Sequence, residues 1–367
     1  MKKLVILAPR AYAFFDPQNA MARELGIGGA EVQLCLLARD LADRKAADVH
    51  IVVADCGQGD QLVRDGITLH VGFSFRDSSV RAMTDLMSCL WRVHGDVYIQ
   101  RAIHEVSGIL AIVFRFSRAK FVYMVAHDGE TDNSPIIYRN RFIRLGGWLV
   151  FRLADRVVVQ NQYEWDQLWK RVRASRLAML CKGVVVPRNE VPAKSEYDAV
   201  WAGRCVAWKR PDLFLRLAAR SPDLRFLMLC PKGPEPTPYQ ARVRTHAARL
   251  PNVDFVDFVS PGDMCRQLSR GRAFCLTSKQ EGDWPMVALE AAAVGVPVVS
   301  YGINPGLLID RYGGGALCNG RVGEMEAWIR RLRNEPSVWS AMSQAARRFI
   351  ASERDIRVCA DRLLAIL

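Results

Sequence analysis

Short runs of apolar residues alternate with longer amphipathic stretches along almost the whole chain. The first runs predict strands at Leu4–Ala8, His50–Val53, Val97–Ile99, Lys120–Val125, Arg156–Val159 and Leu177–Leu180. A second set follows at Ala199–Ala202, Arg225–Leu229, Val253–Phe255, Ala273–Leu276, Val296–Ser300 and Ala316–Leu317. Between them, helical periodicity predicts helices such as Ala30–Asp43, Trp165–Arg173, Pro211–Ala219, Ala241–Ala248, Pro261–Leu268 and Met286–Val294. Nearly continuous apolar strands that alternate with helices are typical of parallel sheets covered on both faces, so the predicted fold class is α/β.

Two sets of about six strands predict two doubly wound domains. The polar stretch at 186–197 contains two prolines and is interpreted as the linker between them, and residues 336–367 are helical throughout by pattern. We therefore expect domains at 1–190 and 191–340, followed by a C-terminal helical segment at 341–367. In such sheets ligands bind at the carboxyl ends of strands, near helix N-termini, and two domains provide a natural ligand site in the cleft between them.

Composition narrows the classes of protein. The 367 residues exceed the usual limit for one core, roughly 250–300 residues, and a 50% hydrophobic content excludes disorder. Lys and Arg number 51 against 38 Asp and Glu, a formal charge of +13. Such an excess indicates a polyanionic partner, whether nucleic acid, a phosphorylated ligand or an acidic membrane surface.

Cysteine usage and hydropathy indicate the compartment. The ten cysteines are scattered without a CxxC pair, and several lie in apolar runs, which favours a reduced, cytoplasmic protein over a secreted or zinc-binding one. The start MKKLVILAPR has too short an apolar run for a signal peptide and is interpreted as the first strand. No stretch approaches the roughly 18 apolar residues that a membrane span needs.

The first candidate motif is the run Gly-Ile-Gly-Gly-Ala-Glu at 26–31, immediately before the predicted helix at 30–43. Gly28 and Gly29 at a helix start let an anion approach exposed backbone N–H groups, and the helix dipole favours that anion. The dinucleotide spacing GxGxxG and the phosphate loop GxxxxGK[ST] are both absent. A simple turn into the helix remains the alternative.

The second motif is Ala-His-Asp-Gly-Glu, directly after the predicted strand at 120–125. At the carboxyl end of a strand, His127 can hydrogen-bond a substrate or stabilise developing charge. The alternative is a histidine that caps the local backbone. The acids Asp128, Glu130 and Asp132 could suggest a metal site, but without a second histidine or a facing carboxylate cluster we interpret them as solvated loop acids.

The third motif follows the predicted strand at 199–202 and places Arg204 and Lys209 ahead of a helix whose first turn contains Pro211. Two cations five residues apart at such a position can converge on a diphosphate, the guanidinium as a fork and the ammonium as a point charge. In a chain this basic, two solvated surface cations are the alternative.

The fourth and strongest motif runs from Thr277 to Ser300: a Gly/Pro loop after a strand, a helix from about Pro285, and Gly-Val-Pro before another strand. Glu281 lies in the loop and Glu290 lies in an otherwise apolar helix. A carboxylate among alanines and a leucine needs a partner, and the hydroxyls of a sugar are suitable ones. An N-terminal helix acid plus a surface glutamate is the alternative.

Taken together, these segments resemble the GT-B-fold, retaining, nucleotide-sugar-dependent glycosyltransferases of glycosyltransferase family 4. The resemblance covers most of the chain in the family's order: GGAE, AHD, ADRVVVQNQYE, KGVVVP, AGRCVAWKRPD and SKQEGDWPMVALEAAAVGVPVVS. The last segment is the most specific. The resemblance implies two Rossmann-like domains facing across a cleft, with a C-terminal helix that crosses back to brace the N-terminal domain.

The resemblance implies a role for each matching residue. Gly28 and Gly29 would lie under the donor phosphates and beside the acceptor, and His127 would face the transferred sugar. Arg204 and Lys209 would neutralise the diphosphate, so no metal would be required. The family comparison also implies that the anomeric configuration is retained, through front-face attack and without a protein nucleophile.

In the fourth motif, the resemblance implies that Glu281 and the backbone amides of Gly282, Asp283 and Trp284 contact the donor hexose, and that Glu290 binds the ribose hydroxyls. One departure matters here. The family's two glutamates are usually separated by seven residues, whereas eight separate Glu281 from Glu290. The extra residue falls most naturally in the Gly-Asp-Trp-Pro loop, where Asp283 could take over some polar contacts of Glu281.

The predicted function is transfer of a hexosyl-type sugar from a UDP- or GDP-sugar to a saccharide, lipid-linked or small-molecule acceptor, in bacterial glycan or natural-product biosynthesis. A GT-B-fold epimerase or phosphorylase is disfavoured by the EGDWP segment and by the lack of a pyridoxal-type lysine context. A sugar-nucleotide-binding protein without transferase activity stays open. So does a basic nucleic-acid-binding protein, although no zinc finger, RNP or basic-helix pattern supports one, and we predict no nucleic-acid partner.

The positive charge is concentrated at 139–182, where ten Lys and Arg stand against three acids. The apolar residues Phe142, Ile143, Trp148, Leu149 and Phe151 alternate there with Arg139, Arg141, Arg144 and Arg152. A solvated helix face is one interpretation. The other is peripheral contact with anionic lipid on the inner face of the cell membrane, to which each nearby cation contributes ~1 kcal/mol.

Overall fold

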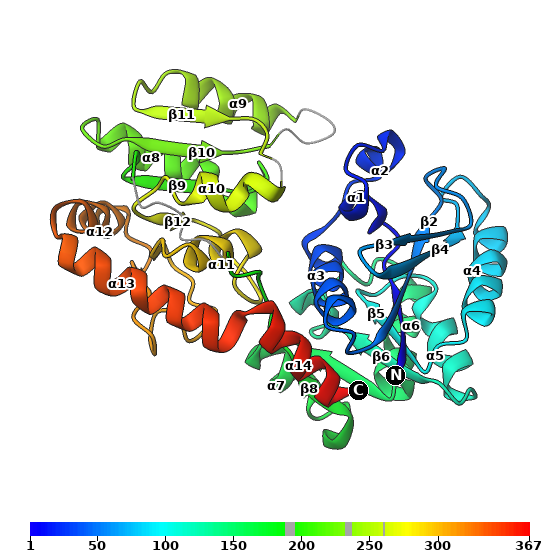
Figure 1. The fold of residues 1–367 in the computed structure, drawn as a ribbon. Helices are drawn as coiled ribbons and strands as arrows, with labels where there is room; N and C mark the ends of the chain where they lie inside the picture. The colour runs from blue at the N-terminus through cyan, green and yellow to red at the C-terminus, as the bar shows by residue number, and fades with distance from the viewer. Residues whose placement is uncertain (188–194, 232–236, 260) are drawn as a thin grey trace. The chain divides into compact units, whose positions relative to one another are not determined.

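The computed structural model describes residues 1–187, 195–231, 237–259 and 261–367 (Figure 1). They form two compact units: unit 1 comprises Met1–Lys182 with Ile356–Leu367, and unit 2 comprises Gly183–Asp355. The predicted boundary after residue 190 and most of the predicted linker lie outside the described residues. Residues 341–355, which the sequence pattern groups with the C-terminal helix, pack within unit 2.

Unit 1 contains an eight-stranded sheet in the order β3-β4-β2-β1-β5-β6-β7-β8. Its strands are β1 (Lys3–Leu7), β2 (Asp48–Ala54), β3 (Gln61–Arg64), β4 (Ile67–Phe73), β5 (Val97–Arg101), β6 (Lys120–Met124), β7 (Arg156–Val159) and β8 (Leu177–Met179). All six predicted strands of the first set are confirmed, and they are parallel. Only the β3–β4 pair is antiparallel, and its Asp65-Gly66 turn has positive φ at both residues. An Asp-Gly pair is a strong hairpin signal, but the hairpin was not predicted because β3 is exposed and polar.

Alternate residues of β1 bury themselves in two separate cores, as a central parallel strand requires. Leu4 and Ile6 join a core with helices on one face of the sheet, among them α3 and α14, while Val5 and Leu7 join the core under α4, α5 and α6. The α-helices of the unit are α1 (Tyr12–Phe15), α2 (Ala20–Leu25), α3 (Gly29–Asp43), α4 (Ser79–Val93), α5 (Ser107–Arg115), α6 (Arg141–Leu153), α7 (Gln162–Leu168) and α14 (Ile356–Ile366). Two short 3₁₀ helices, η1 (Asp128–Glu130) and η2 (Ala174–Arg176), complete it.

Unit 2 contains a six-stranded, fully parallel sheet in the order β11-β10-β9-β12-β13-β14. All six predicted strands of the second set are confirmed: β9 (Ala199–Ala202), β10 (Phe226–Leu229), β11 (Val253–Val256), β12 (Phe274–Leu276), β13 (Val298–Ser300) and β14 (Gly315–Leu317). The strand order reverses between β9 and β12. In such sheets ligands bind at the carboxyl ends of the two strands that flank this switch point.

Helices cover both faces of the second sheet and continue into the C-terminal segment. They are α8 (Pro211–Arg220), α9 (Pro238–Ala248), α10 (Met264–Leu268), α11 (Met286–Ala293), α12 (Val322–Asn334) and α13 (Pro336–Phe349), with 3₁₀ turns η3 (Ala207–Lys209) and η4 (Pro261–Asp263). A π-helical turn, η5 (Ile350–Arg354), follows α13. The expectation of an unbroken helix over 336–367 is therefore wrong, because Asp355 is extended (φ −58°, ψ 133°). The chain resumes as α14, which packs against α3 in unit 1, as the family resemblance implies.

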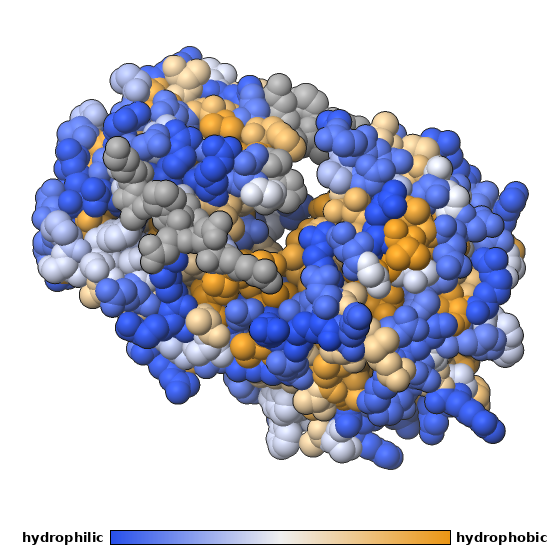
Figure 2. Space-filling model, in the orientation of Figure 1, coloured by the Kyte–Doolittle hydropathy of each residue, from blue (hydrophilic) through white to orange (hydrophobic). Residues whose placement is uncertain are grey.

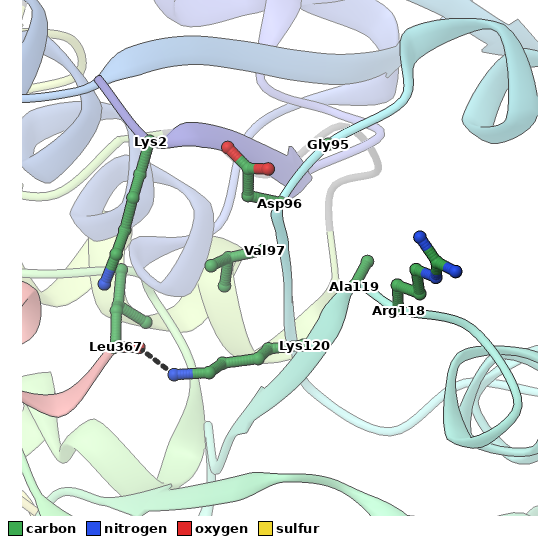
Figure 3. Close-up of a pocket in the computed structure, with 8 residues that line it drawn as sticks. All are labelled: Lys2, Gly95, Asp96, Val97, Arg118, Ala119, Lys120 and Leu367. Carbon is green, nitrogen blue, oxygen red and sulfur yellow. Dashed lines mark hydrogen bonds between the residues drawn. The ribbon is translucent and has the colours of Figure 1, made fainter.

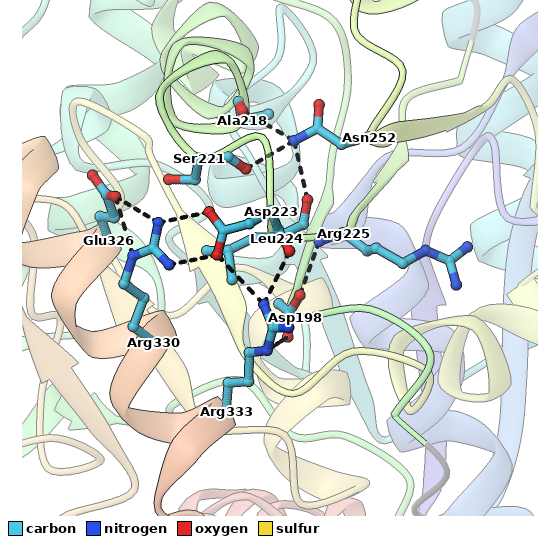
Figure 4. A network of polar contacts seen from close by, with 10 residues as sticks. All are labelled: Asp198, Ala218, Ser221, Asp223, Leu224, Arg225, Asn252, Glu326, Arg330 and Arg333. Atoms are coloured by element: carbon cyan, nitrogen blue, oxygen red, sulfur yellow. Dashed lines mark hydrogen bonds and ion pairs between the residues drawn. The ribbon is translucent and has the colours of Figure 1, made fainter.

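A network of ion pairs fixes the amino-terminal edge of the second sheet (Figure 4). Arg330 of α12 forms a two-pronged contact with Asp223 and also reaches Glu326, while Arg333 contacts Asp198 and Asp223. The Arg330 guanidinium lowers the pKa of Asp223 to about 2. The network thus links α12 to the chain that enters β9 and β10, at the edge opposite to the carboxyl ends of these strands.

The surface in Figure 2 is mainly hydrophilic, with smaller hydrophobic areas between the charged side chains. In the part of the chain that the structure describes, every helix is too short or too polar to cross a membrane. All ten cysteines are free thiols, and eight of them are buried. The cysteines therefore serve as small core residues, as their apolar sequence contexts indicate.

Candidate active site

The two cations of the third motif lie where the switch point predicts a ligand. Gly203 and Arg204 follow the carboxyl end of β9, and the Arg204 side chain is exposed. Lys209 ends the short helix η3, and Pro211 begins α8. The β9–α8 connection therefore brings both cations to the carboxyl edge of the sheet of unit 2.

Hydrogen bonds join this connection to the loop that follows β12. The indole N–H of Trp201 donates to the Thr277 hydroxyl (2.8 Å), and that hydroxyl donates to the Lys209 carbonyl (2.7 Å). The backbone N–H of Lys279 donates to the Trp208 carbonyl (2.9 Å). The third and fourth sequence motifs are thus parts of one structure, positioned by side chains buried between β9 and β12.

Lys209 and Glu281 form an ion pair within this structure, and both side chains are largely buried. The ammonium also lies 4.3 Å from the ring centroid of Trp208. Burial lowers the pKa of Lys209, and the nearby Arg204 lowers it further, while Glu281 opposes both. An anion bound beside Lys209 and Arg204 would offset both the desolvation of the ammonium and its repulsion from the guanidinium, so the electrostatics favour a negatively charged ligand.

Asp283 and Trp284 point into the protein and not toward a ligand. Asp283 is 1% exposed and accepts two hydrogen bonds from the Arg354 guanidinium, at 2.7 and 2.9 Å. Trp284 is fully buried, and its indole N–H donates to the Gly306 carbonyl (3.3 Å). The expectation that the Asp283 carboxylate replaces contacts of Glu281 is therefore wrong, because that carboxylate is already bound to Arg354. The predicted contact of the Gly282 to Trp284 backbone amides with the donor does not involve these two side chains.

Glu290 lies on α11, and its side-chain carboxylate has no hydrogen-bond or ion-pair partner among the described residues, although the helix around it is buried. Burial raises the pKa of Glu290 to about 7. Its carboxylate lies near α10, since it helps to raise the pKa of the Cys265 thiol. A half-buried carboxylate without donors is costly unless a ligand supplies them, which fits the predicted contact with sugar hydroxyls.

The Glu290→Gln variant tests this unfavourable burial in the unliganded protein. Native Glu290 keeps its proton up to about pH 7, whereas the unfolded chain loses it near pH 4.5, so its contribution to the free energy of unfolding falls as the pH rises through this window. We expect the variant to match the wild type at pH 4 and to be more stable at pH 8, by at most about 3 kcal/mol. Urea unfolding at both pH values measures the difference. An equal effect of the substitution at pH 4 and pH 8 would contradict this account.

In unit 1, the first motif forms the start of α3. Gly28 is the N-cap residue, no side chain caps the helix, and both Gly28 and Gly29 are exposed. A Cβ atom at either position would meet nothing within 4 Å. The Glu31 carboxylate of the first turn accepts a hydrogen bond from the Gly28 backbone, and the open space beside Gly28 and Gly29 still leaves room for the predicted anion at the helix start.

His127 follows β6 and serves as the N-cap of η1. Its Nδ1 accepts a hydrogen bond from the Gly129 backbone N–H (3.0 Å), so the local capping role considered as the alternative is real. This bond places the proton of the neutral ring on Nε2. Because the side chain is exposed, the Nε2–H remains available as a donor, so the capping role and the predicted role are compatible.

Two of the three acids of this loop are not solvated, contrary to expectation: Asp128 and Glu130 are buried, whereas Asp132 is exposed as expected. Glu130 accepts a hydrogen bond from the Tyr123 hydroxyl (2.6 Å), and burial raises its pKa to about 7. Glu164, which the sequence motifs did not single out, is buried beside them, and burial raises its pKa to about 8. Asn161 caps α7 by accepting from the Glu164 N–H, and an Asn followed three residues later by Glu is a helix-start signal that could have revealed this. These buried acids brace the loop that carries His127.

Unit 1 also contains a pocket of about 250 Å³, and none of the candidate site residues lines it (Figure 3). It is lined by Lys2, Gly95, Asp96, Val97, Arg118, Ala119, Lys120 and Leu367, at the amino-terminal ends of β1, β5 and β6. The Lys120 ammonium donates to the Leu367 carbonyl (2.7 Å), which ties down the end of α14. The pocket therefore belongs to the packing of α14. In the described parts of the chain, no three His, Cys, Asp or Glu residues are grouped as metal ligands.

A family model and curated proteins match parts of the chain. Residues 187–349 match the model of the family "Glycosyl transferases group 1". The chain is 25% identical over 218 residues to an uncharacterized glycosyltransferase of Haemophilus influenzae, covering 57% of this chain and 60% of that protein. It is 30% identical over 170 residues to D-inositol 3-phosphate glycosyltransferase of Mycobacteroides abscessus, covering 41% of this chain and 38% of that protein. The chain thus spans less than two thirds of either curated relative.

Solved structures match the whole chain. Sucrose-phosphate synthase from Thermosynechococcus elongatus matches with a TM-score of 0.77 at 15% identity, over 100% of this chain and 98% of that one. HepE from Anabaena, in complex with UDP-glucose, matches with a TM-score of 0.74 at 17% identity over 100% of both chains. The chain has the GT-B fold. In GT-B terms, unit 2 carries the candidate donor-site residues, and unit 1 carries His127 and the start of α3.

Proposed function

We propose that this GT-B protein is a retaining glycosyltransferase of family 4, which transfers a hexosyl-type sugar from a UDP- or GDP-sugar to an acceptor hydroxyl. The observation that carries the proposal is the joining of Arg204, Lys209 and the loop before α11 at the switch point of unit 2. The family match over the same residues supports it, as does the likeness in fold to HepE, which was crystallised in complex with UDP-glucose.

In the proposed reaction, negative charge grows on the leaving diphosphate while the anomeric carbon becomes cation-like. Arg204 and Lys209, with backbone amides at a helix terminus, stabilise this charge, so the reaction does not depend on a metal ion, and the amides of Gly282 to Trp284 contact the donor hexose. Glu290 accepts hydrogen bonds from the ribose hydroxyls. In this proposal, Glu290 binds the ribose of the nucleotide, whereas Arg204 and Lys209 stabilise the charge on the leaving diphosphate.

Glu281 is already paired with Lys209, and donor binding therefore has two consequences for this pair. The diphosphate becomes a second anion for the ammonium, and the Glu281 carboxylate can turn part of its hydrogen-bonding capacity to the donor hexose. In unit 1, we assign the start of α3 to phosphate and acceptor binding, and the His127 Nε2–H to the transferred sugar. Retention then follows from front-face attack, in which the departing β-phosphate takes the acceptor proton.

The acceptor we propose is a saccharide, a lipid-linked saccharide or a glycosylated small molecule, processed by a cytoplasmic enzyme that contacts the membrane peripherally. The test is incubation with a panel of UDP- and GDP-sugars in the presence of EDTA, with detection of released nucleoside diphosphate. We expect slow hydrolysis of one donor even without an acceptor. Tight binding of a donor without any release would support a nucleotide-sugar-binding protein instead, and absence of both binding and release would overturn the proposal.

A further inference from the structure

Two neighbouring helices of unit 1 expose large apolar side chains to solvent. α5 and α6 pack closely against each other through glycines, because a Cβ atom at Gly108 would lie 2.7 Å from the Gly146 Cα. Their inner sides bury Phe114, Val150 and other residues in the same core beneath the sheet. The outer sides of both helices therefore point away from the sheet. We call these outer sides, together with residues 116–118, the α5–α6 face.

The α5–α6 face is strongly apolar for a solvent-exposed surface. Phe116 is 87% exposed, Phe142 66% and Trp148 54%. The exposed large apolar residues of this face are Ile109, Ile112, Phe116, Phe142, Leu145 and Trp148. Scattered single apolar residues are normal on a protein surface, but six large ones on the α5–α6 face indicate a binding surface.

The charge on this face has one sign. Residues 107–118 and 140–153 contain no Asp or Glu, and their arginines are Arg115, Arg118, Arg141, Arg144 and Arg152. Two of the guanidinium groups lie over exposed rings of the face, Arg141 over Phe142 (5.4 Å to the centroid) and Arg152 over Trp148 (5.7 Å). At its edge, Arg139 is already paired with Glu105 (2.9 Å). The arginines of the face itself remain for a negatively charged partner.

We propose that the α5–α6 face docks on an anionic lipid bilayer. Interleaved aromatic and aliphatic side chains fit the boundary between headgroups and acyl chains, and the arginines fit the lipid phosphates. A second copy of the chain would bring arginine against arginine across a two-fold interface. Nucleic acid would satisfy the charge but would leave the six apolar side chains without a function. The lipid surface alone satisfies both features.

The structure also corrects the extent of the basic region expected from the sequence. The predicted segment, 139–182, ran through α7 to the end of β8, whereas the exposed apolar residues lie on α5 and α6. Arg156 and Arg176 within that segment are bound to backbone carbonyls of unit 1. Along the sequence, the α5–α6 face therefore begins before residue 139 and ends before residue 182, the bounds that the charge pattern predicts.

Co-sedimentation of the full-length protein with vesicles tests the proposal, because it needs neither donor nor acceptor and is independent of glycosyl transfer. Vesicles of phosphatidylcholine alone are compared with vesicles that also contain phosphatidylglycerol, at low salt. We expect binding only to the anionic vesicles. Each cation near such a surface contributes about fivefold in affinity, so Arg141→Glu/Arg144→Glu should weaken binding at least tenfold.

The matched control is Arg216→Glu/Arg220→Glu on α8 of unit 2, which makes the same change in net charge and should bind more tightly than the α5–α6 charge variant. A second variant, Phe142→Ser/Trp148→Ser, keeps all the charge and should also weaken binding at least tenfold. Circular dichroism confirms that each variant is folded. Failure of the wild type to sediment with anionic vesicles overturns the proposal. An equal loss of vesicle binding in the control variant also overturns it. So does a result in which the α5–α6 variants lose dimerisation or DNA binding but still bind vesicles.

Discussion

Arg204→Ala is expected to lower the turnover of glycosyl transfer by roughly 10²–10³-fold while leaving the free energy of unfolding nearly unchanged. The side chain is exposed at the carboxyl end of β9, so its removal leaves no cavity and no buried partner. What the variant loses is a preorganised positive charge beside the leaving diphosphate. Steady-state kinetics on the hydrolysed donor, with urea unfolding of the same samples, measure both effects.

Arg225→Ala is the matched control for this prediction. Arg225 is also an exposed arginine of unit 2, but it precedes β10 at the opposite edge of the sheet, near Asp254. We expect its turnover to stay within about twofold of the wild type, as is usual for surface substitutions away from a site. If Arg204→Ala retains wild-type turnover, the assignment of this edge to the diphosphate is wrong.

The role of Lys209 is tested with a single and a double variant, because removing Lys209 also leaves Glu281 without its ion-pair partner. Lys209→Met alone leaves a buried carboxylate without its cation, which lowers stability as well as turnover. Lys209→Met/Glu281→Gln removes both charges and should restore stability without restoring turnover. This separates the electrostatic role of the ammonium from its role in the fold.

Arg354→Ala is expected to destabilise the protein by about 3–5 kcal/mol, the usual cost of breaking a buried ion pair. Arg354 and Asp283 are 5% and 1% exposed, so the variant leaves the Asp283 carboxylate buried without its guanidinium. Because Asp283 lies in the loop before α11, we also expect KM for the donor to rise. Urea unfolding and donor kinetics measure the two effects.

The control for Arg354 is another arginine of unit 2 with a two-pronged carboxylate contact, but at the surface. Arg330→Ala breaks the contact with the exposed Asp223 and should destabilise the protein far less than Arg354→Ala does, because water screens the surface pair. The double variant Arg354→Gln/Asp283→Asn should recover much of the stability that Arg354→Ala loses, since no buried charge is left alone. Equal costs for Arg354→Ala and Arg330→Ala would contradict the special role of the buried pair.

The sheets were largely predictable because central parallel strands are buried on both faces and appear as apolar runs. β3 was missed because an exposed edge strand lacks such a run, and β4 was missed because its buried residues are interrupted by partly exposed ones, although Asp65-Gly66 marked their turn. Arg204 and Lys209 could be placed correctly at a strand end from local pattern alone. The resemblance then supplied their chemistry, which pattern alone could not provide.

The remaining details depend on contacts between distant parts of the sequence. Asp283 looked like a ligand contact because its partner, Arg354, is 71 residues away and belongs to a helical turn with no local signal. Glu130 and Asp128 looked solvated because their burial depends on Tyr123, Asn161 and Glu164, which come from other elements. Local patterns locate a loop, but they do not show which of its side chains turn inward.

We expect the carboxyl edge of the second sheet to bind a nucleoside diphosphate through Arg204, Lys209 and Glu290. Isothermal titration calorimetry of the wild type with UDP and with GDP, in EDTA, measures this binding. We predict saturable binding of at least one of them at one site per chain, weakened at least tenfold by Arg204→Ala and unchanged by Arg225→Ala. Absence of binding by either nucleotide, or equal affinity in wild type and Arg204→Ala, would contradict the account.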